Sequence, residues 1–108
     1  MMQRLTQAEE QVMLRLWGLK EATVKDIIQF YPLPKPAYNT TSTIVRILER
    51  KKFIGHKKKG RGFIYFALIS KEDYRNYLAD WMLNNYFDCS KQGAINYFNQ
   101  NKLLDELL

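Results

Sequence analysis

Residues 37–52 read AYNTTSTIVRILERKK, and this stretch decides the fold. Its more apolar face repeats at the three- and four-residue spacing of a helix, at Thr41, Ile44, Val45 and Leu48. The opposite face carries short polar side chains and two arginines, namely Asn39, Thr40, Ser42, Thr43, Arg46 and Arg50. We therefore predict an amphipathic helix over about 38–51, with either Ala37 or Asn39 at its N-cap.

Two shorter helices are predicted before this one. Thr6 and Glu9 have the spacing of a capping box, in which each side chain bonds the backbone N–H of the other residue. We expect Gly18 to end the apolar stripe that follows, which consists of Ala8, Val12, Met13, Leu16 and Trp17. Thr23 and Asp26 repeat the capping signature, and that helix ends where the backbone is fixed by Pro32, Pro34 and Pro36.

A β-hairpin is predicted after the third helix. Residues 53–57 and 63–67 have strand-like patterning, and the glycines between them suit a tight turn. Three helices followed by a hairpin is the order of the winged-helix variant of the helix-turn-helix, whose third helix enters the major groove of DNA. We expect a mainly α fold with a small β-hairpin: a winged helix-turn-helix domain over 1–69 and a C-terminal helical dimerisation arm over 70–108.

Positive charge is concentrated in the first part of the chain. Residues 1–69 hold 13 Lys and Arg against 5 Asp and Glu, whereas residues 70–108 hold 4 against 6. From Arg50 to Arg61 there are seven basic residues and no acid. A solvated lysine-rich turn would have the same composition, but the order of the helices favours a contact with DNA phosphates.

The predicted DNA contacts form two groups. The outer face of the third helix is predicted to read bases through Asn39, Thr40, Ser42, Thr43 and Arg46. The ends of that helix and a basic wing over 57–62 are predicted to bind phosphates through Tyr38, Arg50, Lys51, Lys57, Lys58, Lys59 and Arg61.

The region 70–108 is predicted to form a homodimer. Ser70 caps a fourth helix, a break falls at 88–90, and a fifth helix begins at Lys91. The region holds more apolar surface than a neighbouring core of about 70 residues can cover. The side chains expected to pack against a second copy are Tyr74, Leu78, Trp81, Met82, Ile95, Phe98, Leu103, Leu104 and Leu107. The other interpretation is that these helices fold back on their own domain.

The sequence shows no catalytic, metal-binding or cofactor-binding constellation. His56 and Cys89 are each the single residue of their type, which leaves no disulfide within the chain and little for catalysis. Glu9 and Glu10 fall where a signal peptide would be apolar, and no run reaches the roughly 20 apolar residues of a membrane span. We expect a cytoplasmic protein that is not an enzyme, needs no cofactor and does not insert into a membrane.

The same residues resemble a known family. The run 37–52, followed by Gly60-Arg61 and Tyr65, is similar to the penicillinase-repressor family (BlaI/MecI type). The resemblance extends to three further stretches, which are Thr6–Glu9 with Trp17, Ser70–Tyr74 and 87–98. Two positions depart from the usual family pattern: Ile47 stands where Arg is common, and Lys52 where Gly is common.

The resemblance implies a winged-helix homodimer that represses transcription at palindromic operators on double-stranded DNA. In the best-known branch a membrane-linked sensor triggers proteolysis of the repressor when a β-lactam is present, so a sensor or signalling protease is an implied partner. Relatives usually continue past the position of Leu108, which leads us to expect a weaker dimer. The alternative function is a winged helix used as a protein–protein interaction or assembly module, without sequence-specific DNA binding.

Overall fold

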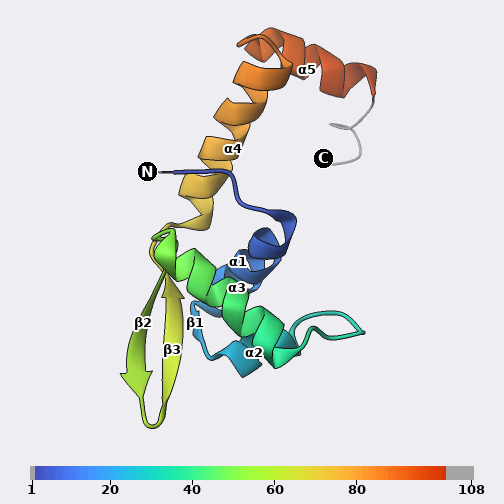
Figure 1. The fold of residues 1–108 in the computed structure, drawn as a ribbon. Coiled ribbons are helices and arrows are strands. Elements are labelled where there is room, and N and C mark those ends of the chain that lie inside the picture. The colour runs from blue at the N-terminus through green and yellow to red at the C-terminus, as the bar shows by residue number, and fades with distance from the viewer. Residues whose placement is uncertain (1, 102–108) are drawn as a thin grey trace. The chain divides into compact units, whose positions relative to one another are not determined.

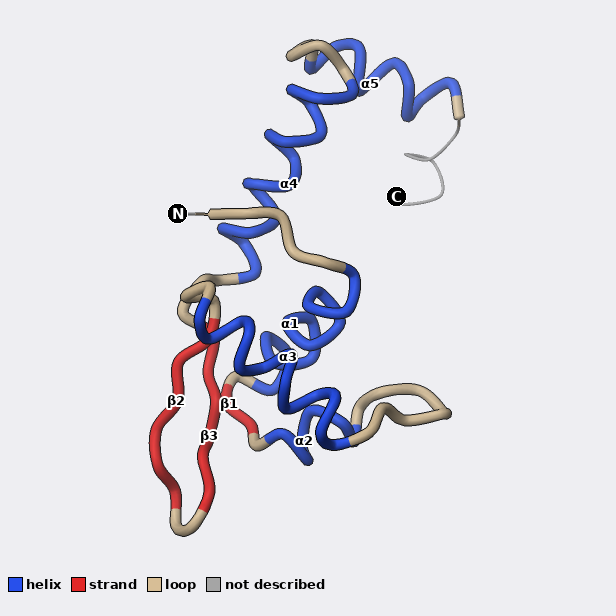
Figure 2. Tube along the Cα trace, viewed as in Figure 1, coloured by secondary structure: helices blue, strands red, loops and turns tan. Residues whose placement is uncertain are grey.

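The computed structural model of the chain describes residues 2–101. Over this range the chain forms five helices and one small antiparallel sheet (Figures 1 and 2), which confirms the expected mainly α, winged-helix class. Two compact units are present, one ending at Asp73 and the other beginning at Tyr74. The predicted domain boundary after Ile69 stays a prediction.

Helix α1 spans Gln7–Leu19 and starts as predicted. The Thr6 side chain accepts a hydrogen bond from the backbone N–H of Glu9 at 3.2 Å, and the Glu9 carboxylate accepts one from the N–H of Thr6 at 2.8 Å. The prediction that Gly18 ends the helix is wrong. The helix continues for one more residue and stops at Lys20, whose φ of 71° lies outside the helical region.

Helix α2 is short, Val24–Gln29, and begins with a second capping box formed by Thr23 and Asp26. A loop over 30–37 contains the three prolines and leads into α3, Tyr38–Arg50. Ala37 is the N-cap of α3 and supplies no side-chain hydrogen bond. Of the two predicted caps, Ala37 is therefore the one that the structure shows.

Helix α3 ends in a Schellman motif that has a lysine at its left-handed position. The N–H of Lys52 donates to the carbonyl of Glu49 at 3.1 Å, and the N–H of Phe53 donates to the carbonyl of Leu48 at 3.0 Å. Lys52 has a φ of 68°, a conformation that glycine adopts without steric cost. Phe53 is completely buried, and its burial holds the chain in this turn.

The sheet has the strand order β1–β3–β2, with β1 at Glu21–Ala22, β2 at Ile54–Lys59 and β3 at Gly62–Ala67. Strands β2 and β3 confirm the predicted hairpin, and we call residues 54–67 the wing. Strand β1 was not predicted, because two residues are too few to show an alternating pattern. It pairs with the second half of β3, at Tyr65 and Phe66, and so joins the wing to the helices.

The turn of the wing is tighter than the sequence indicated. Lys59 pairs with Gly62, so only Gly60 and Arg61 lie between the strands. Gly60 has a φ of 60°, and Arg61 is not in the positive-φ region. These values fit a type II′ turn, which places Arg61 at the very tip of the wing.

The core of the first unit lies between its three helices and the base of the wing (Figure 1). The indole N–H of Trp17 on α1 donates to the carbonyl of Ile69 at 2.9 Å and so fixes the chain where it leaves β3. The largest side chains that are fully buried are Phe53, Met13, Leu16, Ile27, Leu48, Ile54, Val12, Val45 and Thr41.

A partly buried ion pair joins α1 to the residue that follows α3. Glu9 is only 4% exposed and occupies the buried position that the sequence pattern assigned to its neighbour Ala8, which is exposed. The Lys51 ammonium donates to both oxygens of the Glu9 carboxylate, at 2.7 and 2.9 Å. Burial alone would raise the pKa of Glu9, but the hydrogen bonds and charge of Lys51, with the bonds from Thr6, lower it overall.

The second unit consists of most of α4, Lys71–Tyr86, and of α5, Lys91–Gln100. The predicted break between them is confirmed: Asp88 and Cys89 have φ angles of 51° and 64°, and Ser90 caps α5. None of the helices described over 2–101 has the length and apolar character needed to cross a membrane.

Replacing Lys51 by Met should destabilise the protein in a pH-dependent way. The change leaves the Glu9 carboxylate buried without its cation, and we expect a loss of about 1–3 kcal/mol in the free energy of unfolding at pH 7. Because the pKa of Glu9 is lowered by folding, the stabilisation is complete above the ordinary carboxyl pKa and is lost as the pH falls through the folded-state value.

Urea denaturation at a series of pH values measures this difference. The exposed Lys59→Met is the matched control and should change stability little at any pH. A Lys51→Met deficit that stays constant into strong acid would contradict the assignment of the effect to Glu9.

Candidate nucleic-acid interface

The outward face of α3 is the first element of the candidate interface. Its inner stripe is fully buried, at Thr41, Val45 and Leu48. Directly opposite, at helical spacing, lies an exposed stripe formed by Asn39, Thr43, Arg46 and Arg50. The structure therefore brings four of the predicted DNA-contacting residues into one line on the surface.

Hydrogen bonds within α3 limit what these side chains can offer a partner. The Thr43 hydroxyl donates to the Asn39 carbonyl at 2.9 Å, so its oxygen is left as an acceptor. The Arg46 guanidinium lies 3.4 Å from the Ser42 hydroxyl, a long contact, and the Arg46 side chain is exposed. Acceptors beside an extended arginine can discriminate base edges in the major groove.

The remaining predicted residues of α3 lie on its two flanks. Ser42 shares the flank of Glu49, which faces the wing. Thr40 is exposed on the other flank, the one that carries Lys51 toward α1. Lys51 was predicted to bind a phosphate, but its ammonium donates to both oxygens of the Glu9 carboxylate, and we remove it from the candidate contacts.

The wing is fixed to α3 by a pair that the sequence analysis did not anticipate. The Nδ1 atom of His56, on β2, makes a close contact with the Glu49 carboxylate. The His56 ring packs edge-on against Phe63, with ring centroids 4.9 Å apart. Burial raises the pKa of the neighbouring Tyr65 phenol, and the charge on Glu49 raises it further while Arg46 opposes the change. These side chains therefore form one cluster between helix and hairpin.

The basic residues of the wing are not equivalent. Residues that face each other across antiparallel strands share one side of the sheet, so Lys58, paired with Phe63, lies on the side of His56 and α3. Lys57 and Lys59 point to the other side. The Lys57 ammonium lies 3.1 Å from the Glu21 carboxylate in an exposed ion pair. The carboxylate therefore partly neutralises the positive charge of Lys57.

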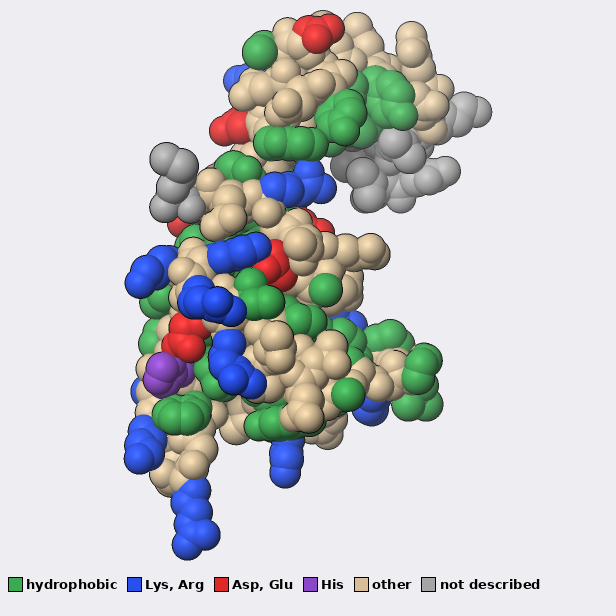
Figure 3. Space-filling model, in the orientation of Figure 1, with side chains coloured by type: hydrophobic (Ala, Val, Ile, Leu, Met, Phe, Trp, Pro, Cys, Tyr) green, Lys and Arg blue, Asp and Glu red, His purple; other side chains and the backbone are tan. Residues whose placement is uncertain are grey.

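Five basic side chains of the candidate interface are exposed and make no ion pair with any of residues 2–101. They are Arg46, Arg50, Lys58, Lys59 and Arg61. Figure 3 shows Lys and Arg side chains spread over the face of α3 and along the hairpin, with few acidic groups among them. Such a surface attracts a polyanion.

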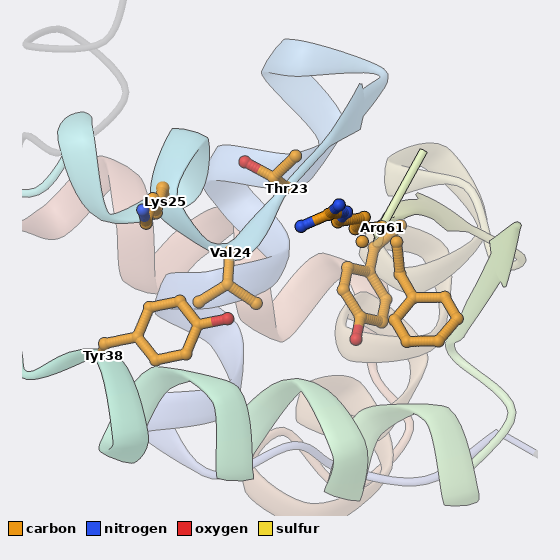
Figure 4. A pocket seen from close by; sticks show the side chains of 8 residues that line it. Thr23, Val24, Lys25, Tyr38 and Arg61 are labelled. Atoms are coloured by element: carbon orange, nitrogen blue, oxygen red, sulfur yellow. The ribbon is translucent and has the colours of Figure 1, made fainter. Parts of the chain in front are cut away.

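A cleft opens between the wing and the starts of α2 and α3. Its volume is about 380 Å³, and Figure 4 shows the side chains that line it. Arg61 extends from the wing toward Thr23, while Tyr38 lies across from Val24 (Figure 4). Lys25 also lines the cleft, and no sequence pattern indicates this, because a single lysine on a short helix carries no signal.

The predicted dimerisation residues lie in the second unit, except for three that fall outside the described residues: Leu103, Leu104 and Leu107. Of residues 74–101, only Tyr74 and Ala94 are buried. Partial exposure is found for Leu78, Trp81, Met82 and Phe98, and Ile95 is 46% exposed.

Aromatic side chains group around the break between α4 and α5. Phe87 lies 5.6 Å from Tyr97 and 6.1 Å from Phe98, measured between ring centroids. Two further rings of this unit are largely exposed: Tyr86 at 70% and Tyr97 at 48%. The described part of the second unit thus carries an apolar surface that its own fold does not cover.

In a comparison with known protein families, one family model matches a range that extends over both units. Residues 5–107 match the family model described as penicillinase repressor. No curated protein matches the chain. Within residues 2–101, no three His, Cys, Asp or Glu side chains are grouped as a metal ion would require.

Proposed function

The chain belongs to the penicillinase repressor family of DNA-binding transcriptional regulators, and from this premise we propose that it represses transcription as a homodimer on a palindromic operator. Helix α3 would lie in the major groove and the wing on the phosphate backbone. Because the proposed target is chromosomal DNA, we place the protein in the cytoplasm. The family resemblance further implies induction through a membrane-linked sensor, and we include a signalling protease as a proposed partner.

The observation that carries this proposal is the exposed stripe on α3. Asn39, Thr43 and Arg46 lie opposite a buried stripe, so they cannot turn inward without breaking the core. Arg50 extends the stripe, and Lys58 continues the positive charge on the wing face next to it. A surface used only to bind another protein would not need hydrogen-bond acceptors and an arginine in one line with further cations beside them.

Base reading by Arg46 can be separated from phosphate binding by a pair of variants. A palindromic duplex selected from a random pool should bind far more tightly than its scrambled version at the same salt concentration. Arg46→Ala should cost about 1–3 kcal/mol on the selected duplex and less on the scrambled one. Arg50→Ala, the matched control on the same stripe, should weaken both duplexes alike.

Fluorescence anisotropy with both duplexes measures these affinities. Equal losses for Arg46→Ala on the two duplexes would move Arg46 to a phosphate role. Equal affinities of the unmodified chain for the two duplexes would favour the interaction module over the repressor.

The wing should contribute affinity without sequence preference. Lys58→Ala removes one cation from the α3 side of the wing, so the slope of log K against log salt should fall by about one unit for every duplex. Lys57→Ala should change the slope less, because Glu21 already lies beside that ammonium. A Lys58→Ala variant with altered sequence preference and an unchanged salt slope would show that the wing reads bases instead.

The homodimer is supported by the uncovered apolar surface of the second unit. Ile95, Tyr86 and Tyr97 are large side chains exposed by 46% or more in the single chain. A second copy would bury them, and a two-fold axis would set two α3 helices about one DNA turn apart, roughly 10 bp.

Introducing a charge on this surface should weaken the dimer. Ile95→Glu places a carboxylate on the proposed apolar interface and should shift the dimer–monomer equilibrium toward monomer by at least about tenfold. Asn96→Asp, at an exposed position that lies on a different face of the same helix from Ile95 and Tyr97, should leave it unchanged. Sedimentation of the intact chain and its variants measures this equilibrium. The dimer would be contradicted by an intact chain that stays monomeric and binds a half-site as tightly as the palindrome.

A further inference from the structure

The cleft between the wing, α2 and α3 has the chemistry of an anion site. Two cations reach it from different elements, Lys25 from α2 and Arg61 from the turn of the wing. Hydroxyl groups come from Thr23 and from Tyr38, the first residue of α3. None of the eight residues that line the cleft is acidic, so the charged side chains that line it are both cations.

Apolar side chains line the cleft beside these polar groups, and they narrow the class of anion that fits. Val24 is buried at the base, and Phe63 presents a ring that is 45% exposed. A volume of about 380 Å³ is at the small end of ligand sites. An anion that carries a compact, weakly polar neighbour fits such a space, and a phosphodiester linked to deoxyribose has this form.

The place of the cleft in the fold favours a ligand that is part of a DNA strand. Tyr38 lines the cleft, and the next residue, Asn39, begins the exposed stripe of α3. A strand whose phosphate enters the cleft therefore passes directly beside the end of the stripe.

We propose that this cleft clamps one sugar–phosphate unit of the DNA backbone. Lys25, Tyr38 and Arg61 bind the phosphate oxygens, while Val24 and Phe63 pack against the deoxyribose. The clamp rests on the proposed DNA-binding function and adds to it a fixed point for the strand, which sets the position of α3 along the groove. It also makes Lys25, on a helix with no other assigned contact, a residue that binds DNA.

If the clamp forms, the losses of DNA affinity caused by changing Lys25 and by neutralising one particular phosphate should not be additive. A duplex selected by the intact chain is prepared in versions that each carry one neutral methylphosphonate linkage. For the unmodified chain, one linkage in each half-site should weaken binding about tenfold when neutralised through the loss of its contact with Lys25. For Lys25→Gln, which is weakened about tenfold on the native duplex, neutralising that same linkage should cause little further loss.

Lys20→Gln is the matched control, an exposed lysine of the same unit outside the cleft, and it should retain the full methylphosphonate effect. Phe63→Ala provides a second measurement: affinity should fall while the salt slope stays the same, because the contact with the sugar carries no charge.

The outcomes separate this proposal from the function on which it rests. A chain that binds duplex but shows additive effects of Lys25→Gln at every linkage overturns the clamp and leaves the repressor intact. Binding of inorganic phosphate in the cleft, seen as shifts of the Lys25 and Gly62 amide signals without any coupled linkage, assigns a free-anion site and also overturns the clamp. A chain that binds no duplex overturns both.

Discussion

The burial of Thr41, Val45 and Leu48 along one stripe of α3 is the constraint on which the other features of the first unit depend. A helix with three completely buried positions at i, i+4 and i+7 cannot rotate about its axis without exposing them, at about 1.5–3 kcal/mol for each large apolar side chain. The identity of the exposed stripe therefore follows from the buried one.

Two polar contacts hold α3 on either side of this stripe. Lys51 binds Glu9 of α1 on one flank, and Glu49 meets His56 of β2 on the other. Each uses a carboxylate within a strongly basic unit, and a third carboxylate, Glu21, lies beside Lys57. Because these acids are engaged inside or beside the fold, the remaining cations determine the charge of the outward surface. The net charge of the sequence understates how positive that surface is.

The sequence was sufficient to predict a structural feature wherever that feature depends on residues close together in the chain. The capping boxes at Thr6 and Thr23 and the two faces of α3 depend on residues three or four positions apart, and the structure confirms them. The pairing of Glu9 with Lys51 joins residues 42 positions apart, so no local pattern showed that Lys51 is engaged. The left-handed Lys52 was noticed only as a departure from the family pattern, and its φ of 68° supplies the physical reason why glycine is common there.

The exposed face of α3 in the candidate site was predictable from the sequence, whereas the cleft beside it was not. Asn39, Thr43 and Arg46 could be assigned from periodicity alone, whereas the cleft that contains Lys25 exists only because α2, α3 and the wing meet in space. The most direct measurement is the change in backbone amide signals of the intact, isotope-labelled chain when a selected palindromic duplex is added. We expect the largest changes on residues 38–50 of α3, on Lys25 and on the wing tip around Arg61. Changes confined to α4 and α5, with α3 unaffected, would contradict this expectation.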